Sequence, residues 1–370
     1  MPKSGVISAD SHMFEPLNLW VDRIEPRFKE KAPKYVFDEQ KKALLLIIDG
    51  LSPRNIMSSM AVAQKPEDYQ EFFKKGLEGA RPGGWDPAER IKDMDIDGVD
   101  AAVLYTSHGR WMFMIEDPLY QEACFKAYND WIADFCSHNP RRLIGISLIS
   151  LYNIENAVWE LRRCRDIGLR GALIWGGHSL GSREYDPVWK EAQELEMPLT
   201  IHATSGTDRK IKSTNAPIWN NTVGHISKPN QAQQSLAELM FSGVLDRHPQ
   251  LKIVAAEYDV GWIPYFLQHT DALYRRWSPM SGTKLSILPS ELFRRQLFVT
   301  FIRDPIGMKM VAASILQPDN PMWCDDYPHG ASTWPHSLEV ISKNMADLSE
   351  TDRGKITRDN AAKLYGITLN

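Results

Sequence analysis

The sequence predicts an α/β fold in which eight parallel strands alternate with helices. Short apolar runs of strand length recur along the chain, separated by longer segments with helical spacing. Parallel strands need helical crossovers, and eight such strands close into a filled barrel. Acidic and histidine residues follow several of the apolar runs, as expected for side chains at the mouth of such a barrel. We therefore expect a distorted (β/α)8, TIM-type barrel.

The expected elements follow one another in the order that a barrel requires. The eight strands are expected at residues 5–9, 101–105, 143–149, 171–175, 199–202, 253–256, 297–301 and 322–324. Helical spacing predicts helices over residues 118–138, 154–167, 188–195, 231–246 and 262–274. The polar segment 205–230 is expected to be a long loop at the active end of the barrel.

The connection after the first strand is longer than an ordinary barrel loop. Within it, the apolar run 44–48 ends at Asp49-Gly50, a dipeptide typical of tight turns. The sequence thus predicts a small inserted hairpin or lid within residues 14–98. No repeat or low-complexity linker indicates a second domain, so residues 1–370 are expected to form one domain.

Composition excludes several classes of protein. The 370 residues are 43% hydrophobic, and 43 basic and 47 acidic residues are spread along the chain, which disfavours a nucleic-acid partner. The longest apolar stretch, residues 43–48, is far short of the roughly 20 residues that cross a bilayer. The four cysteines form no Cys-x-x-Cys pair, and the N-terminus has no signal-peptide pattern. We expect a cytoplasmic protein without a membrane span.

Five residues of metal-binding types stand at the ends of the expected strands. Asp10 and His12 follow the first strand at alternate positions, so both side chains can reach one ion. His202 ends the fifth strand, Glu257 follows the sixth, and Asp326 follows the eighth. Because these ends meet at one mouth of the barrel, the pattern predicts a metalloenzyme.

Ordered motifs give the chain a family resemblance. They are the segments 10–16, 141–175 with its Gly168-Leu-Arg-Gly171, 198–202, 257–262 and 325–329. Together they resemble the amidohydrolase-related family, which includes aminocarboxymuconate semialdehyde decarboxylase and the resorcylate-type aromatic decarboxylases. The resemblance covers nearly the whole chain.

The resemblance implies roles for individual residues. Asp10 and His12 stand where the superfamily has a His-x-His metal pair, and His202 matches the next histidine ligand. Asp326 matches an aspartate that binds metal or handles the proton of a metal-bound water, with Asp325 as the alternative one residue away. Glu257 departs from the histidine of many relatives, and a carboxylate there can serve as a ligand or as a general acid or base.

The expected cofactor is a divalent metal, Zn, Mn or Fe, as one or two ions, because carboxylates and imidazoles together suit these metals. No lysine ends the fourth strand, so a carboxylated-lysine bridge is not expected. His329, His178 and Trp175 lie near the mouth and are expected to contact substrate.

The expected function is a metal-dependent hydrolase or non-oxidative decarboxylase acting on a small carboxylate- or carbonyl-bearing substrate. Two alternatives stay open at this stage. One is a dinuclear Fe or Mn oxygenase on the same fold. The other is a metal-binding partner subunit of a hetero-oligomeric enzyme. Whichever function holds, we expect the chain to form a homo- or hetero-oligomer with related barrels.

Overall fold

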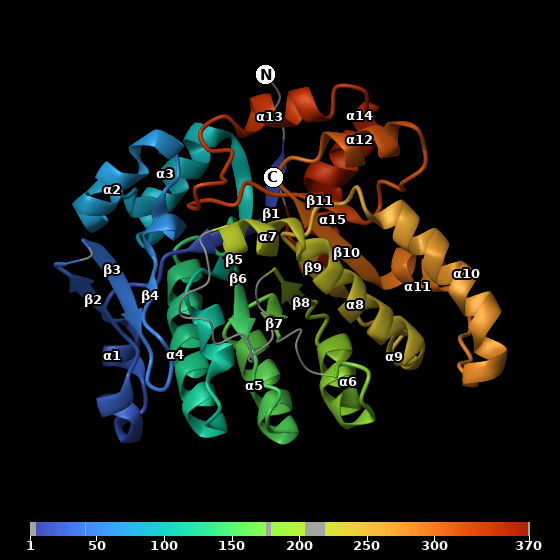
Figure 1. Cartoon of the computed structure of the whole chain (residues 1–370), viewed down its shortest axis with the longest axis horizontal. Helices are drawn as coiled ribbons and strands as arrows, with labels where there is room; N and C mark the ends of the chain where they lie inside the picture. The colour runs from blue at the N-terminus through green and yellow to red at the C-terminus, as the bar shows by residue number, and fades with distance from the viewer. Residues whose placement is uncertain (1–4, 41, 175–178, 204–218, 369–370) are drawn as a thin grey trace.

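The computed structural model describes residues 5–40, 42–174, 179–203 and 219–368. Its centre is a parallel sheet that curls into a barrel inside a layer of helices, which confirms the predicted fold (Figure 1). The strands pair in chain order: β1 (Val6–Met13), β5 (Val99–Thr106), β6 (Leu143–Leu148), β7 (Gly171–Leu173), β8 (Leu199–His202), β9 (Ile253–Ala256), β10 (Leu297–Phe301) and β11 (Pro321–Trp323).

Helices cover the outside of the barrel and connect successive strands. They are α4 (Pro118–Ser137), α5 (Ile154–Asp166), α6 (Asp186–Glu194), α7 (Trp219–Ile226), α8 (Lys228–Phe241), α9 (Val244–Arg247), α10 (Ile263–Ser281), α11 (Pro289–Gln296) and α12 (Pro305–Ala312). After β11 come α13 (Ser337–Asn344), α14 (Glu350–Gly354), the π-helical turn η8 (Lys355–Asp359) and α15 (Asn360–Tyr365).

Two predictions about the segment between β8 and β9 need correction. The expected loop 205–230 is helical over α7 and at the start of α8, while residues 204–218 lie outside the described residues. The expected helix 231–246 is divided into α8 and α9. Gly243 lies between them at φ +78°, a conformation that costs glycine little but ends a helix.

The insertion after β1 is larger than the predicted hairpin. It contains an antiparallel sheet of β2 (Lys34–Asp38), β3 (Ala43–Ile47) and β4 (Arg54–Asn55), which lies outside the barrel with α1 (Leu19–Arg23), α2 (Tyr69–Lys75) and α3 (Pro87–Asp97) (Figure 1). The predicted turn at Asp49-Gly50 lies between β3 and β4, with Gly50 at φ +77°. Strand β4 was not predicted because its two residues are polar and too few to show the periodicity of a strand.

Strand β1 is longer than the expected 5–9, so Asp10 and His12 lie inside the strand. Its pairing with β5 is irregular between Ser8 and Ser11, where β1 has one residue more than β5. Such a bulge redirects side chains and is frequent beside active sites. The sequence hid this extension because polar residues interrupt the apolar run.

Among the described residues, no ladder of backbone hydrogen bonds joins β11 to β1. Buried side chains and two backbone hydrogen bonds from the loop after β11 close the barrel there instead. The carboxylate of Asp325, directly after β11, accepts hydrogen bonds from the hydroxyls of Ser8 and Ser11, each at 2.7 Å. The His12 amide donates to the carbonyl of Tyr327 at 2.6 Å. From α3, buried Arg90 donates to the His12 carbonyl at 2.9 Å and stacks on the Tyr327 ring.

Two expectations about the chain as a whole can be compared with the structure. All four cysteines are buried free thiols. Within the described residues, no helix combines the length and the apolar character needed to cross a bilayer.

We expect Asp325→Ala to destabilise the fold strongly. It leaves the hydroxyls of Ser8 and Ser11 without their acceptor, and it leaves the charge of Arg90 without the carboxylate that faces it. Removing one partner of a buried charged network costs about 3–5 kcal/mol in free energy of unfolding. Urea unfolding measures this loss. The control Asp134→Ala removes an exposed carboxylate paired with Arg23 and should cost under about 1 kcal/mol; equal losses would contradict the closure role.

Candidate metal centre

Three predicted ligands converge inside the mouth of the barrel. Asp10 and His12 of β1 meet His202 at the end of β8, and all three are buried. Asp10 Oδ1 lies 3.4 Å from His12 Nε2 and 3.3 Å from His202 Nε2. The three ligand atoms all lie within 4.8 Å of one another, so one ion can contact them together.

The protonation of His12 fits a metal ligand. Its Nδ1 donates to the Thr106 carbonyl at 3.1 Å, which leaves the Nε2 lone pair directed toward Asp10. That Nε2 is buried and has no hydrogen-bond partner among the described residues. Burial, followed by the charge of His329, lowers the pKa of His12 and favours the neutral imidazole. A buried lone pair without a donor indicates a site built for a cation.

Asp10 is held in its ionised form. Burial by itself would raise its pKa, but the adjacent imidazoles of His202 and His12 outweigh that cost and lower it. Thr300 of β10 donates to Asp10 Oδ2 at 2.9 Å and fixes the carboxylate. One carboxylate with two imidazoles is a donor set that suits Zn, Mn or Fe.

A second group shares His12 and adds Asp326 and His329. Asp326 Oδ1 lies 3.5 Å from His12 Nε2 and 2.8 Å from His329 Nδ1. The rings of His12 and His329 stack at 4.1 Å, and His329 Nε2 contacts the Ser107 hydroxyl at 3.0 Å. Burial and then the charge of Arg110 lower the pKa of His329 to about 3. Burial and the charge of Glu257 raise the pKa of Asp326.

Asp326, and not Asp325, faces the cluster. Asp325 turns toward the hydroxyls of Ser8 and Ser11, whereas Asp326 has a left-handed φ of +53° that turns its carboxylate toward His12. Left-handed backbone at residues other than glycine costs free energy and clusters at functional sites.

Glu257 lies outside both ligand groups. It also has a left-handed φ, of +67°, and its amide donates to the Thr300 hydroxyl at 2.7 Å. Its carboxylate forms an ion pair with Lys228 of α8 and lies 3.7 Å from His202 Nδ1. Burial opposes ionisation, but Lys228 and then His202 lower the pKa of Glu257 to about 2. The structure therefore places it behind His202 as an ionised partner.

Three residues were predicted to contact substrate. His329 joins the cluster directly. Trp175 and His178 lie outside the described residues.

Sequence reasoning missed Lys228, Thr300 and Arg110. Lys228 was assigned to a loop, Thr300 is an interior residue of an apolar strand, and Arg110 follows β5 without a recognisable motif. Each of the three residues interacts with a residue that is distant in the sequence, so no local pattern indicated its role.

Residues 63–367 match the Amidohydrolase family. The chain belongs to the amidohydrolase family. The match confirms the family resemblance, and it begins after the β1 residues Asp10 and His12.

Relatives of this amidohydrolase include decarboxylases. It is 26% identical over 300 residues to a gamma-resorcylate decarboxylase of Rhizobium sp. (strain MTP-10005), covering 75% of this chain and 86% of the relative. It is 25% identical over 296 residues to a 2-amino-3-carboxymuconate-6-semialdehyde decarboxylase of Dictyostelium discoideum, covering 77% of this chain and 78% of the relative.

Solved structures share the fold. An amidohydrolase from Mycobacterium avium subsp. paratuberculosis superposes with a TM-score of 0.79 at 20% identity, over 98% of this chain and 99% of that chain. A 5-carboxyvanillate decarboxylase mutant from Novosphingobium aromaticivorans, solved with bound manganese, superposes with a TM-score of 0.70 at 19% identity. The superposition covers 98% of this chain and 97% of that chain. The family match and the curated relatives identify an enzyme of the decarboxylase-like branch, and the converging ligand atoms fit a divalent metal.

We expect His202→Ala to lose its bound metal, because one of three converging ligand atoms disappears. Inductively coupled plasma mass spectrometry on protein purified without added metal measures ions per chain. The control His336→Ala removes a histidine that is 71% exposed and should keep the wild-type content. Equal metal content in both variants would contradict the ligand assignment.

We expect Thr300→Val to weaken metal binding without unfolding the barrel. The change keeps the side-chain shape but removes the donor to Asp10 and the acceptor for the Glu257 amide. Loss of a partner that orients a ligand weakens metal affinity about 10–100-fold. Competition with a chromophoric chelator measures the affinity. Thr351→Val, at an exposed helical position, should leave it unchanged.

Proposed function

We propose that the chain is a metal-dependent, non-oxidative decarboxylase of a small carboxylate with an oxygen substituent beside the carboxylate-bearing carbon. The observation that carries the proposal is the Asp326–His329 pair, which lies against the unpaired Nε2 of His12. Decarboxylation needs a proton donor at the carbon that loses carbon dioxide, and this pair supplies one beside the ligand cluster. The decarboxylase relatives support the proposal.

Asp10, His12 and His202 would hold the ion, with Asp326 beside them. A bound divalent ion supplies Lewis-acid chemistry that polarises oxygen atoms of the substrate. The protein's own part is to keep these ligands in place through Thr106 and Thr300.

Asp326 and His329 can share one proton along their 2.8 Å contact. In the reaction, the bond between the ring or enol carbon and the carboxylate breaks, its electron pair stays on that carbon, and the Asp326 proton is transferred there. Carbon dioxide leaves. Burial and then the charge of Glu257 raise the pKa of Asp326, which favours the protonated carboxyl that this step needs.

Glu257 serves a different role in this proposal. Its pairing with Lys228 holds its charge fixed, so we assign it to orienting His202 and not to proton transfer.

Two arginines beside the site can receive a second oxygen group of the substrate. Arg54 from β4 and Arg110 both lie over Trp111, with Cζ atoms 3.8 and 5.0 Å from ring centroids of that tryptophan. The Nε of each is buried without a partner among the described residues. Two adjacent cations with unused donors favour an anionic or oxygen-rich ligand.

The proposal is tested by incubating the manganese-loaded protein with hydroxylated benzoic acids and related enol carboxylates under anaerobic conditions. We expect carbon dioxide and the protonated product in equal amounts, detected by gas analysis and liquid chromatography. Turnover without dioxygen separates decarboxylation from oxygenation. Hydrolysis of lactones or amides, with no carbon dioxide released from any acid, would contradict the proposal.

We expect Asp326→Asn to lower kcat by about 10²–10⁴-fold, because it removes the proposed proton donor while retaining the size of the side chain. The same assay measures kcat, and metal analysis of the variant separates loss of the proton donor from loss of the ion. Asp134→Asn, an exposed control, should retain wild-type turnover. An Asp326→Asn variant with bound metal and full turnover would assign the proton to another residue.

A further inference from the structure

A cavity opens at the end of the barrel opposite the metal centre. It has a volume of about 710 Å³ and is lined by residues that precede strands, among them Arg170 before β7, Pro198 before β8 and Lys252 before β9. The active-site residues of this fold lie at the carboxyl ends of the strands, so this cavity is separate from the catalytic mouth. Its volume is typical of small-molecule sites.

The cavity is basic although the chain carries a net charge of −4. Seven basic and three acidic residues line it. Two of the acidic residues are already neutralised: Asp319 pairs with Lys355 at 2.7 Å, and Asp359 pairs with Arg358 at 2.6 Å. The uncompensated charge within the cavity is therefore positive.

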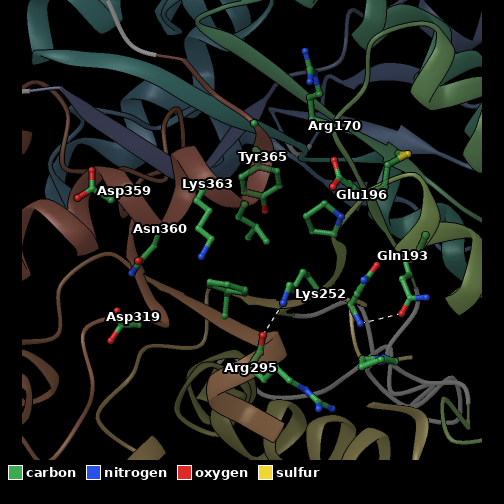
Figure 2. Close-up of a pocket in the computed structure, with 18 of the residues that line it drawn as sticks. Arg170, Gln193, Glu196, Lys252, Arg295, Asp319, Asp359, Asn360, Lys363 and Tyr365 are labelled. Atoms are coloured by element: carbon green, nitrogen blue, oxygen red, sulfur yellow. Dashed lines mark hydrogen bonds between the residues drawn. The ribbon is translucent and has the colours of Figure 1, made fainter. Parts of the chain in front are cut away.

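Lys252 is the basic residue of the cavity whose surroundings most favour an anion. Its side chain is half-buried, and its ammonium donates to the Arg295 carbonyl at 2.7 Å. Burial, then the positive charges of Lys363 and Arg295, lower its pKa. Figure 2 shows Lys252 and Lys363 reaching from different elements toward the same space. No carboxylate of the described residues forms an ion pair with either lysine.

Helix ends explain only part of this charge. Arg294 and Arg295 lie in the last turn of α11, and Arg165 lies in the last turn of α5, where basic side chains stabilise the helix dipole. That explanation does not extend to Lys252, which precedes a strand. The cavity wall also has apolar parts, because Phe298 of β10 and Leu364 of α15 line it and are half-buried.

We propose that this cavity binds a small organic anion that carries at least two negative charges beside an apolar body. Lys252, Lys363 and Arg294 receive its charged oxygens, and Phe298 and Leu364 contact its apolar part. Carboxylate and phosphate oxygens fit this description equally, and the choice between them is made by experiment. The site requires neither the metal nor the proposed reaction.

Isothermal titration calorimetry at constant ionic strength tests the site with citrate and with inorganic pyrophosphate as probes. Each is titrated into the protein as purified and into the same protein after chelation, because either probe can also bind a metal ion. We expect saturable binding of one anion per chain that survives chelation. The stronger probe identifies carboxylate or phosphate oxygens as the preferred group.

The variant Arg294→Glu/Lys363→Glu reverses two exposed charges that line the cavity and leaves the Lys252–Arg295 hydrogen bond in place. Because the variant loses charged contacts to the anion, affinity should fall more than tenfold. The control Lys284→Glu/Lys309→Glu makes the same net charge change at exposed positions outside the cavity and should bind as wild type.

Three results would overturn the proposal. The first is no saturable binding of either probe to the wild-type protein. The second is an equal loss of affinity in the cavity variant and the control, which would show a general charge effect. The third is loss of binding on chelation, which would place the anion at the metal. A sedimentation coefficient that changes only in the cavity variant, with no anion bound to wild type, would instead identify this face as a contact between copies.

Discussion

The buried contact between β1 and the segment after β11 is the interaction on which the metal centre depends. The Asp325 carboxylate holds the hydroxyls of Ser8 and Ser11 at the point where the strand ladder stops. Because β1 carries Asp10 and His12 and the next residue is Asp326, one contact sets the spacing of ligands from both ends of the chain. A buried carboxylate is costly to desolvate, and the hydroxyl donors together with the nearby charge of Arg90 offset that cost.

The two ends of the barrel carry different sets of charged residues. The mouth concentrates the carboxylates of Asp10, Glu257 and Asp326, and burial together with repulsion from the charge of Glu257 raises the pKa of Asp326. A divalent ion relieves such repulsion. At the other end, basic side chains surround a cavity with too few carboxylates to neutralise them. Between the two lies a buried Tyr105 hydroxyl, 3.0 Å from both the Tyr365 and Thr200 hydroxyls.

Much of the fold could be predicted from the sequence because the barrel strands are short apolar runs. The strands at 199–202, 253–256 and 297–301 have the expected bounds, since burial on both faces leaves a continuous apolar signal. The end of β1 was misplaced because its functional residues are polar. The third strand of the inserted sheet was missed because Arg54 and Asn55 pair through their backbone, which no side-chain pattern reveals.

The sequence by itself determined the barrel and predicted Asp10, His12 and His202 as candidate ligands, because each stands in or at the end of a strand that a local pattern predicts. Only the tertiary structure decided which of Asp325 and Asp326 faces the cluster, that Glu257 is paired with Lys228, and that basic residues from distant segments surround one cavity. These arrangements depend on barrel closure and on side chains that are far apart in the chain, and no local periodicity encodes such contacts.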